Sequence, residues 1–326
     1  MHDPISKKAR VAPELAGERV DKIAASLFDD YSRATLSGWI ADGSLTVDGR
    51  QVKAKTRLIG GETLELLATL QPREDWNTAQ AVAFAVVYED ADLLVVNKPP
   101  GLVVHPGAGN RDHTLVNGLL EHRADLAVLP RAGIVHRLDK DTSGLLLVAA
   151  TPAAHHRLVK DLQERAIARH YQAVVEGAMI SGTDIDSPIG RDPQRRTLQK
   201  VRPDGREALT RVRVLERFRS HTLVAAQLQT GRTHQIRVHL SSIGYPLVGD
   251  RRYGARNRLP LHPHGALVAA VRNFSRQALH AQRLQFAHPT TGEQLRFEAP
   301  LPADFAELLE ALRSDLADHL ADHDDR

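Results

Sequence analysis

Cysteine is absent from this chain of 326 residues, and its absence excludes disulfide bonds and thiolate metal sites. Aromatic residues make up only 4% of the sequence. Long apolar runs are also missing, since the longest one, Leu145 to Ala150, is far too short to cross a membrane. Residues 1–15 are polar and basic, unlike a secretory signal. We therefore expect a soluble, cytoplasmic protein that makes no contact with membranes.

The composition is that of an ordinary globular protein, with 42% hydrophobic and 25% charged residues. The net charge is only +3, but the charge is unevenly distributed. Residues 304–326 hold 8 acidic and 2 basic side chains, which leaves the rest of the chain with 41 basic and 32 acidic residues, or +9. A basic body suits a polyanionic partner. Solvated, arginine-rich loops would give the same balance, so charge alone leaves both interpretations open.

The length favours two domains, and the pattern along the chain divides it into four segments. Residues 1–16 are expected to be a flexible tail, and residues 313–326 an acidic C-terminal tail. Residues 17–75 form a small αβ domain and residues 80–312 a larger one, with a linker that contains proline and asparagine over residues 71–80.

The small domain is predicted to hold two helices followed by a hairpin. Ser32 is placed to cap the second helix, and Gly43 to end it. Asp48-Gly49 is typical of a tight hairpin turn, after which Val52 begins the return strand. The apolar residues that share the two helical faces are Val20, Ile23, Ala24, Leu27, Phe28, Leu36, Trp39 and Ile40.

The larger domain is predicted to be rich in strands, with few helices. Thr151-Pro152 is a good helix start, and the stripe of apolar residues after Asp304 predicts a last helix packed on the body. Such an order of elements favours an α+β fold with a mainly antiparallel mixed sheet. The expected strands are 86–88, 93–96, 144–150, 171–175, 212–215, 223–228, 282–286 and 294–297.

One loop concentrates polar side chains directly before a buried strand. It reads His-Arg-Leu-Asp-Lys-Asp-Thr-Ser-Gly over residues 136–144, and such a loop is held rigidly while its side chains stay accessible. A structural loop of caps and ion pairs is the alternative. An aspartic protease is disfavoured because Asp141-Thr142-Ser143-Gly144 has an extra residue and no second copy. Nucleotide-binding glycine motifs and the usual zinc motifs are also missing.

Two further stretches stand out. Residues 230–240 read Thr-Gly-Arg-Thr-His-Gln-Ile-Arg-Val-His-Leu, where Thr233 is placed to cap a helix. Arg232 and Arg237 then flank the first turn, where an arginine can fix a carboxylate in a bidentate pair or simply face solvent. Residues 97–107 read Asn-Lys-Pro-Pro-Gly-Leu-Val-Val-His-Pro-Gly, which predicts a rigid loop after a strand.

These three stretches together resemble the RluA-type pseudouridine synthases, and residues 104–110 are similar to the RluD branch of that family. The resemblance covers nearly the whole chain, from about residue 17 to residue 312. It implies a pseudouridine-synthase fold. The small domain resembles an S4-type RNA-binding domain in its Arg19-Val20-Asp21 and in the stretch Gly-x-Leu-x-Val-Asp-Gly over residues 43–49.

The resemblance assigns roles residue by residue. Asp139 matches the catalytic aspartate of the family, and Arg237 the arginine that pairs with it. Tyr171 matches the tyrosine that stacks on the target base, and Ile236 would pack near that base. Arg137 matches an arginine that contacts RNA beside the extruded uridine. Arg232, together with Arg33, Lys53 and Lys55 of the small domain, completes the predicted RNA contacts.

The implied reaction isomerises a uridine in a stem-loop of large-subunit ribosomal RNA, of the helix 69 type, in free RNA or a pre-ribosomal subunit. It needs neither a cofactor nor a metal, because no electron or phosphoryl group is transferred. Whether the carboxylate attacks the base, attacks the sugar or removes a proton stays open. Nothing in the sequence demands more than a monomer. The alternatives are a synthase for another RNA, such as transfer RNA, and a non-catalytic assembly factor that binds RNA through the S4-like domain.

Overall fold

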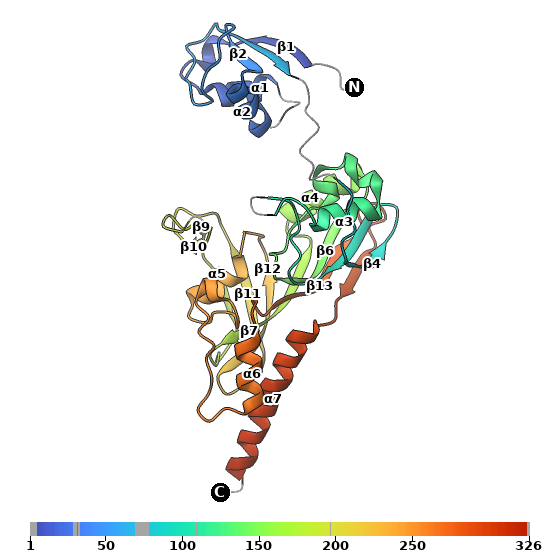
Figure 1. Ribbon diagram of the computed structural model, residues 1–326, viewed down its shortest axis with the longest axis vertical. Helices are drawn as coiled ribbons and strands as arrows, with labels where there is room; N and C mark the ends of the chain where they lie inside the picture. The colour runs from blue at the N-terminus through green and yellow to red at the C-terminus, as the bar shows by residue number, and fades with distance from the viewer. Residues whose placement is uncertain are drawn as a thin grey trace. The chain divides into compact units, whose positions relative to one another are not determined.

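The structure is a computed structural model that describes residues 5–28, 31, 33–68, 78–107, 110–195 and 197–324. The chain divides into two compact units, Met1–Asp75 and Trp76–Arg326 (Figure 1). The dividing point lies inside the predicted linker, much of which is outside the described residues. The elements of the N-terminal unit are β1 (Ile5–Arg10), α1 (Val20–Leu27), α2 (Arg33–Asp42), β2 (Leu45–Val47) and β3 (Thr63–Ala68).

In the N-terminal unit, two helices pack against a three-stranded sheet through one apolar core. The predicted inner face of α2 is confirmed, because Leu36, Trp39 and Ile40 are all buried. Gly43 ends this helix with a φ of 86°, a conformation that glycine adopts without strain. Ser32, which was predicted to cap α2, lies outside the described residues.

The prediction of a flexible tail over residues 1–16 is wrong for its described part. Strand β1 pairs with β3 in antiparallel register from Ile5↔Ala68 to Arg10↔Thr63. Ile5 and Ala9 pack on the core, whereas alternate residues of β1 are exposed. The alternation of half-buried and exposed residues in β1 is short, and three of its six residues are basic, so the sequence did not predict a strand here. The strand is stabilised by its pairing with β3.

The predicted hairpin turn is present, but its predicted return strand is wrong. Asp48 and Gly49 have φ values of 48° and 71°, as a primed turn requires. Strand β2 nevertheless pairs with β3, which begins only at Thr63. Val52 and its neighbour Ala54 rest against the core from an irregular segment. Strand β3 pairs with β2 in place of the segment that begins at Val52, because the more apolar β3 buries more side chains.

The C-terminal unit is built on a nine-stranded sheet of order β4-β5-β6-β13-β7-β12-β11-β8, with β14 paired to β13. All of these pairs are antiparallel except β6 with β13, so the predicted mainly antiparallel mixed sheet is confirmed. Each expected strand lies within one of them or overlaps it. The strands are β4 (Ala85–Glu89), β5 (Leu93–Lys98), β6 (Ser143–Ala149), β7 (Ala168–Glu176), β8 (Thr183–Asp186), β11 (Leu209–Arg217), β12 (His221–Leu228), β13 (Leu279–Ala287) and β14 (Gln294–Glu298).

The parallel contact between β6 and β13 is unusually close. Gly144 has a φ of 110°, and a Cβ atom there would lie 2.2 Å from the carbonyl oxygen of Ala281. Beside it, Ser143 and His280 are joined by a buried hydrogen bond of 2.9 Å. Only glycine fits at residue 144, where the strand that follows the polar loop meets β13.

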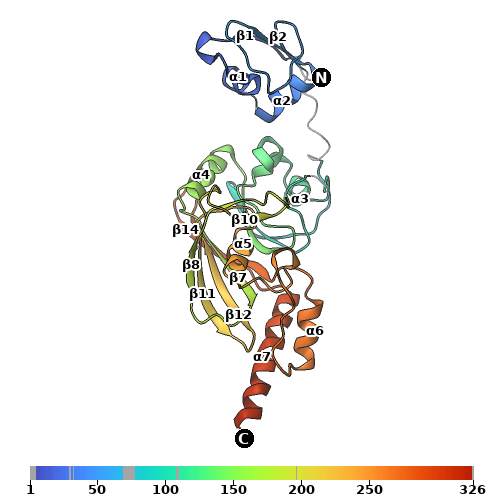
Figure 2. The same ribbon diagram turned by 90° about the vertical axis from the view of Figure 1, so that its left-hand side faces the viewer.

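Helices cover both faces of this sheet (Figures 1 and 2). Helices α3 and α5 both contribute to the apolar core on one face of the sheet, and α4 packs on the opposite face of β5 and β6. The predicted start of α4 is confirmed, because the Thr151 hydroxyl accepts a hydrogen bond from the amide of Ala154. Helices α3 and α6 were not predicted. The helices are α3 (Leu115–His122), α4 (Pro152–Gln163), α5 (Gln235–Ser242), α6 (Gly265–Asn273) and α7 (Ala303–Asp324). A separate two-stranded sheet contains β9 (Ile189–Arg191) and β10 (Gln199–Val201).

The acidic tail predicted for residues 313–326 is instead helical over its described part. Helix α7 continues to Asp324, and Leu316 packs with the core that α6 and α7 share. Asp315 is buried and pairs with Arg219 at 3.2 Å. The acidic residues counted as a tail therefore include one that fastens the helix to the sheet. Among the described residues, no helix is both long enough and apolar enough to cross a membrane.

Candidate active site

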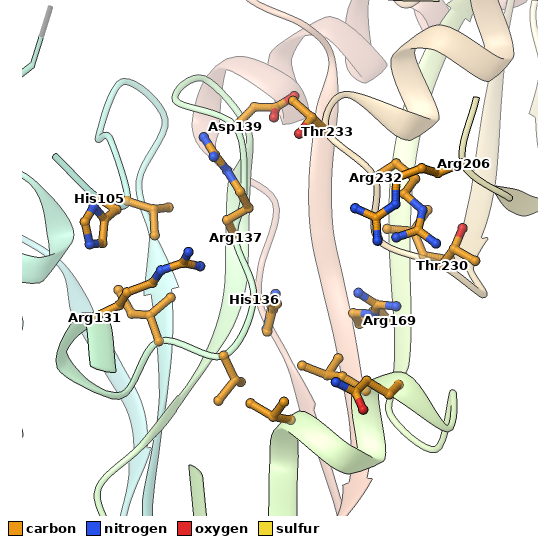
Figure 3. Close-up of a pocket in the computed structure, with 18 of the residues that line it drawn as sticks. His105, Arg131, His136, Arg137, Asp139, Arg169, Arg206, Thr230, Arg232 and Thr233 are labelled. Atoms are coloured by element: carbon orange, nitrogen blue, oxygen red, sulfur yellow. The ribbon is translucent and has the colours of Figure 1, made fainter. Parts of the chain in front are cut away.

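The polar loop before β6 lies where two cavities of the C-terminal unit meet. Their volumes are about 790 and 520 Å³, and Asp139 and Arg137 line both. The side chain of Asp139 is 17% exposed, whereas Arg137 is exposed and points into the larger cavity (Figure 3). The loop is thus accessible and held by a buried strand, as predicted.

Arg237 joins Asp139 to a second carboxylate. Its Nη1 donates to Asp139 Oδ2 at 3.0 Å, so the predicted contact is present. Its Nε and Nη2 donate to the two oxygens of Asp250 at 2.6 and 2.9 Å. Burial alone would lower the pKa of Arg237, but the hydrogen bonds and charge of Asp250, and then of Asp139, raise it overall. The guanidinium is therefore permanently charged and fixed in orientation.

Helix α5 carries Arg237 in its first turn, but the predicted cap of that helix is wrong. The N-cap is His234, in the left-handed conformation with a φ of 57°, and no side chain caps it. Gln235 replaces the predicted Thr233 in organising the turn. Its side-chain oxygen accepts from the amide of Arg232 at 3.0 Å and from the hydroxyl of Thr230 at 2.8 Å. Threonine is a common N-cap residue, which is why Thr233 was predicted to cap the helix. Because His234 adopts the left-handed conformation, the helix begins one residue later than predicted.

Lys98 holds the polar loop in place through hydrogen bonds to backbone carbonyl oxygens. It is fully buried at the end of β5, and its ammonium donates to the carbonyl oxygens of Pro99, Leu102 and Lys140 at 2.8 to 2.9 Å. Burial lowers the pKa of Lys98 to about 7, against the opposing charges of Asp141 and Asp139. One side chain thus ties the proline-rich loop after β5 to the residue beside Asp139.

Tyr171 lies on β7 and lines the larger cavity together with Asp139. Its ring is 5% exposed and belongs to the main core cluster. Burial raises the pKa of Tyr171 to about 12, so the phenol is neutral throughout the physiological range. Its ring is part of the cavity lining, and its stacking on the target base stays a prediction.

His136 contributes to the same lining with a fixed tautomer. The amide of Leu147 donates to His136 Nε2 at 3.0 Å. Burial, and then the positive charge of Arg169, lower the pKa of His136 to about 3. The ring is therefore neutral and carries its hydrogen on Nδ1.

The remaining predicted residues divide between cavity and core. Arg232 lines the larger cavity and donates to the carbonyl oxygen of Glu207 at 2.9 Å. Ile236 is buried in the main core, outside the sets of residues that line the two cavities. It supports the site from behind and does not form its wall.

The small-domain residues belong to the N-terminal unit. Arg33 donates to Asp21 at 2.8 Å, and Arg19 also pairs with that buried carboxylate. Lys53 and Lys55 are exposed on the segment that follows the hairpin turn. The two lysines are accessible, whereas Arg33 shares an ion-pair network.

Three residues of the site were given no role by the sequence. Lys98 stands within the stretch 97–107, and Arg169 lies two residues before Tyr171, but their burial is visible only in the fold. Asp250 follows Gly249, whose φ of 76° and tight backbone contact mark a sharp turn. In the sequence, the only indication of a role for Asp250 is that a carboxylate directly follows a glycine. Among the described residues, no cluster of three or more His, Cys, Asp or Glu residues could hold a metal ion.

Comparison with known proteins defines the class of this protein. A family model described as RNA pseudouridylate synthase matches residues 92–242, which include the polar loop, β7 and α5. Two solved human proteins share the fold. RNA pseudouridylate synthase domain containing 1 is 28% identical with a TM-score of 0.53, and domain containing 4 is 26% identical with a TM-score of 0.54. They cover 72% and 70% of this chain, and 97% and 93% of their own. The chain belongs to the RNA pseudouridine synthase family and is an isomerase.

Its curated relatives are similar over almost their full length. Ribosomal large subunit pseudouridine synthase D of Vibrio vulnificus (strain CMCP6) is 51% identical, over 93% of this chain and 93% of its own. The protein of the same name from Pseudomonas aeruginosa is 51% identical, over 97% of this chain and 98% of its own. Because so little of the chain lies outside the compared length, the comparison includes most of both units.

Proposed function

We propose that this synthase isomerises uridines in a stem-loop of large-subunit ribosomal RNA, of the helix 69 type, and that Asp139 is its catalytic carboxylate. The observation that carries this is the position of Asp139, which pairs with a buried arginine and is the single carboxylate in the lining of a cavity that also contains six arginines. The names of the two bacterial relatives supply the choice of RNA. The cavity volume of about 790 Å³ is in the range that admits a nucleotide.

The chemistry requires an ionised carboxylate beside an extruded uridine. The glycosidic carbon–nitrogen bond breaks, the uracil rotates, and a carbon–carbon bond from C5 of the uracil to the same sugar replaces it, while C5 loses a proton and N1 gains one. Arg237 favours the charged form of Asp139 and fixes its orientation. The product is an isomer of the substrate, so no co-reactant enters the balance, and we propose that neither cofactor nor metal takes part.

A loop target suits the remaining residues of the cavity. Extruding a base costs a few kcal/mol, and least where it is unpaired. Tyr171 offers a buried ring on which the uracil can stack, and the exposed Arg137 can occupy the space that the base leaves. Ile236 holds the helix that carries Arg237 against the core. Arg232 contacts the RNA backbone from the cavity wall.

The N-terminal unit is proposed to be an S4-type RNA-binding domain that raises affinity for the same RNA. Lys53 and Lys55 are exposed and available to phosphates, and Arg33 contributes from the start of α2. We propose that the enzyme acts as a monomer in the cytoplasm, on free RNA or on a pre-ribosomal subunit.

The test compares the wild type with the variants Asp139→Ala and Asp139→Asn on large-subunit ribosomal RNA transcripts. Pseudouridine is mapped by chemical adduct and primer extension. Site-specific stops with the wild type alone are expected, and removal of a catalytic carboxylate should lower turnover by about 10³-fold or more. RNA binding by the variants should remain.

Stops on transfer RNA but not on ribosomal RNA would overturn the choice of substrate. Equal stops with Asp139→Asn would overturn the catalytic assignment. Binding to ribosomal RNA without stops by the wild type, on both free transcript and subunit particles, would indicate an assembly factor instead.

A further inference from the structure

Arg169 is a buried arginine that has no carboxylate partner within the described part of the chain. It lies on β7, two residues before Tyr171, and is 7% exposed. Its Nε atom is buried without a hydrogen-bond partner. Among the described residues, its guanidinium forms neither an ion pair nor a hydrogen bond. Yet it lines the larger cavity, where a ligand could reach it.

Such an arrangement is costly in a free protein. A guanidinium keeps its proton at any ordinary pH, and a buried charge without a counterion is strongly disfavoured. Burial lowers the pKa of Arg169, with only a small opposing effect of Tyr171. Arg237 is similarly buried, but two carboxylates face it. The difference indicates that the counterion of Arg169 arrives from outside the chain.

The surroundings of Arg169 select an anion. Arg206 and Arg232 gather on the same side of the cavity, while Arg131 and Arg137 lie on the opposite side (Figure 3). None of the five forms an ion pair with a carboxylate of the described chain. We call Arg169, Arg206 and Arg232 the arginine wall.

The cavity as a whole has the same character. Its lining holds six arginines and a single carboxylate, Asp139. Among the described residues, only Arg165 of the six has an ion-pair partner, Glu207, at 2.7 Å.

The backbone leaves room for this guanidinium. A Cβ atom on Gly231 would lie 2.9 Å from Nη1 of Arg169. The glycine thus allows the arginine to lie against the loop that carries Arg232. His136 adds a neutral ring on the cavity floor, with its hydrogen on Nδ1. Positive charge and hydrogen-bond donors dominate this end of the cavity, as an oxyanion requires.

We propose that Arg169 is the buried end of an anion site, completed by Arg206 and Arg232, which binds a backbone phosphate of the substrate next to the extruded uridine. The proposal rests on the proposed function, because the anion is taken to be a phosphodiester of the RNA. Residues two apart on a strand are about 7 Å apart, so the phosphate lies one step along the cleft from the ring of Tyr171.

The experiment uses the full-length enzyme with Arg169→Met, Arg169→Lys and Arg272→Gln. Arg272 is an exposed arginine of α6 that lines neither cavity, so its variant removes the same charge elsewhere. Three quantities are measured: the melting temperature without RNA, the affinity for the ribosomal RNA stem-loop across a salt titration, and kcat and KM.

Arg169→Met should melt at the wild-type temperature or above it, since an unpaired buried charge is removed. Its RNA affinity should fall about tenfold or more, and the slope of log affinity against log salt should decrease by about 1. KM should rise more than kcat falls. Arg169→Lys should restore the salt slope, and Arg272→Gln should leave all three quantities unchanged.

A lower melting temperature for Arg169→Met would overturn the proposal, because the arginine would then stabilise the fold. An unchanged salt slope with weakened binding would also overturn it in favour of a contact to a base. Neither outcome depends on turnover. If the wild type forms no pseudouridine, the proposed function fails, yet the melting temperature and salt slope still report on the anion site.

Discussion

The two ends of the active-site cleft treat a buried arginine in opposite ways. At one end, Asp139, Arg237 and Asp250 form a closed network in which each hydrogen bond is 3.0 Å or shorter. We call these three residues the carboxylate end. At the arginine wall, Arg169 is almost equally buried but has no counterion among the described residues.

Under the proposed function, the contrast separates the residues that support the reaction from those that bind the substrate. A catalytic carboxylate acts best when its partners are already in place, because no reorganisation is then needed during the reaction. A binding arginine can stay unpaired, since the substrate itself supplies the missing charge. Binding energy released at the wall is then available to hold the uridine against the carboxylate end.

The largest effect in this comparison is expected from Arg237→Ala. The change leaves Asp250 buried without a partner, which should cost about 3–5 kcal/mol of unfolding free energy, and should lower turnover by about 10²-fold or more. Denaturant unfolding and single-turnover rates measure the two losses. Arg237→Lys is the control that keeps the positive charge but cannot make the paired guanidinium hydrogen bonds to the two carboxylates. A variant with wild-type stability and turnover would contradict the role given to the carboxylate end.

An intermediate effect is expected from Tyr171, which lies between the two ends. Tyr171→Leu removes the ring, and because stacking contributes about 1–3 kcal/mol per base, kcat/KM should fall about 10- to 100-fold. Tyr171→Phe keeps the ring and removes only a neutral hydroxyl that bonds to no described residue, so kcat/KM should stay within about threefold. Steady-state kinetics on the stem-loop substrate compare them. Equal losses in both variants would point to the hydroxyl instead of the ring.

The smallest effect is expected at His136, beside the arginine wall, and concerns the dependence of stability on pH. The pKa of His136 is depressed from 6.5 to about 3 in the folded state. Between these values the unfolded chain binds more protons, so stability is lost as the pH falls. His136→Gln keeps an acceptor for the Leu147 amide but cannot be protonated. At pH 4.5 it should retain on the order of 2 kcal/mol more of its neutral-pH stability than the wild type.

Denaturant titrations of both proteins at pH 7 and pH 4.5 give this difference. The other buried histidines are common to both proteins and cancel. Parallel loss of stability in the two would show that His136 is not held neutral.

Much of the fold was predictable because it depends on local patterns. The apolar run of β6 and the Thr151-Pro152 start of α4 each carry their own signal. Strand β1 was missed because its stability comes from an edge more than fifty residues away in sequence, at Thr63–Ala68. The return strand of the first hairpin was misplaced for the same reason. Helix α3 was missed because it is only 8 residues long and follows a proline-rich loop.

The site was predictable where the resemblance supplied a matching residue, and less so elsewhere. The contact between Arg237 and Asp139 was predicted on that basis. Asp250 and Lys98 were not, because their importance comes from burial, and one residue cannot reveal how deeply it will lie. Arg169 is the extreme case. Its distinguishing property is a missing partner, which no pattern along a sequence can display.

The parallel contact between β6 and β13 also bears on the order in which the protein is assembled. In the strand order β13 separates β6 from β7 and β12, so Asp139 and Arg237 approach from opposite sides of that junction. Residues 143 and 144 pair with residues 280 and 281, which leave the ribosome long afterwards. During synthesis, β4, β5 and β6 therefore cannot join the rest of the sheet until β13 has been made. Nascent chains arrested before residue 279 should be cut by protease within residues 93–149, and chains long enough to expose β13 should resist there, so that Asp139 and Arg237 are brought together only after β13 has formed.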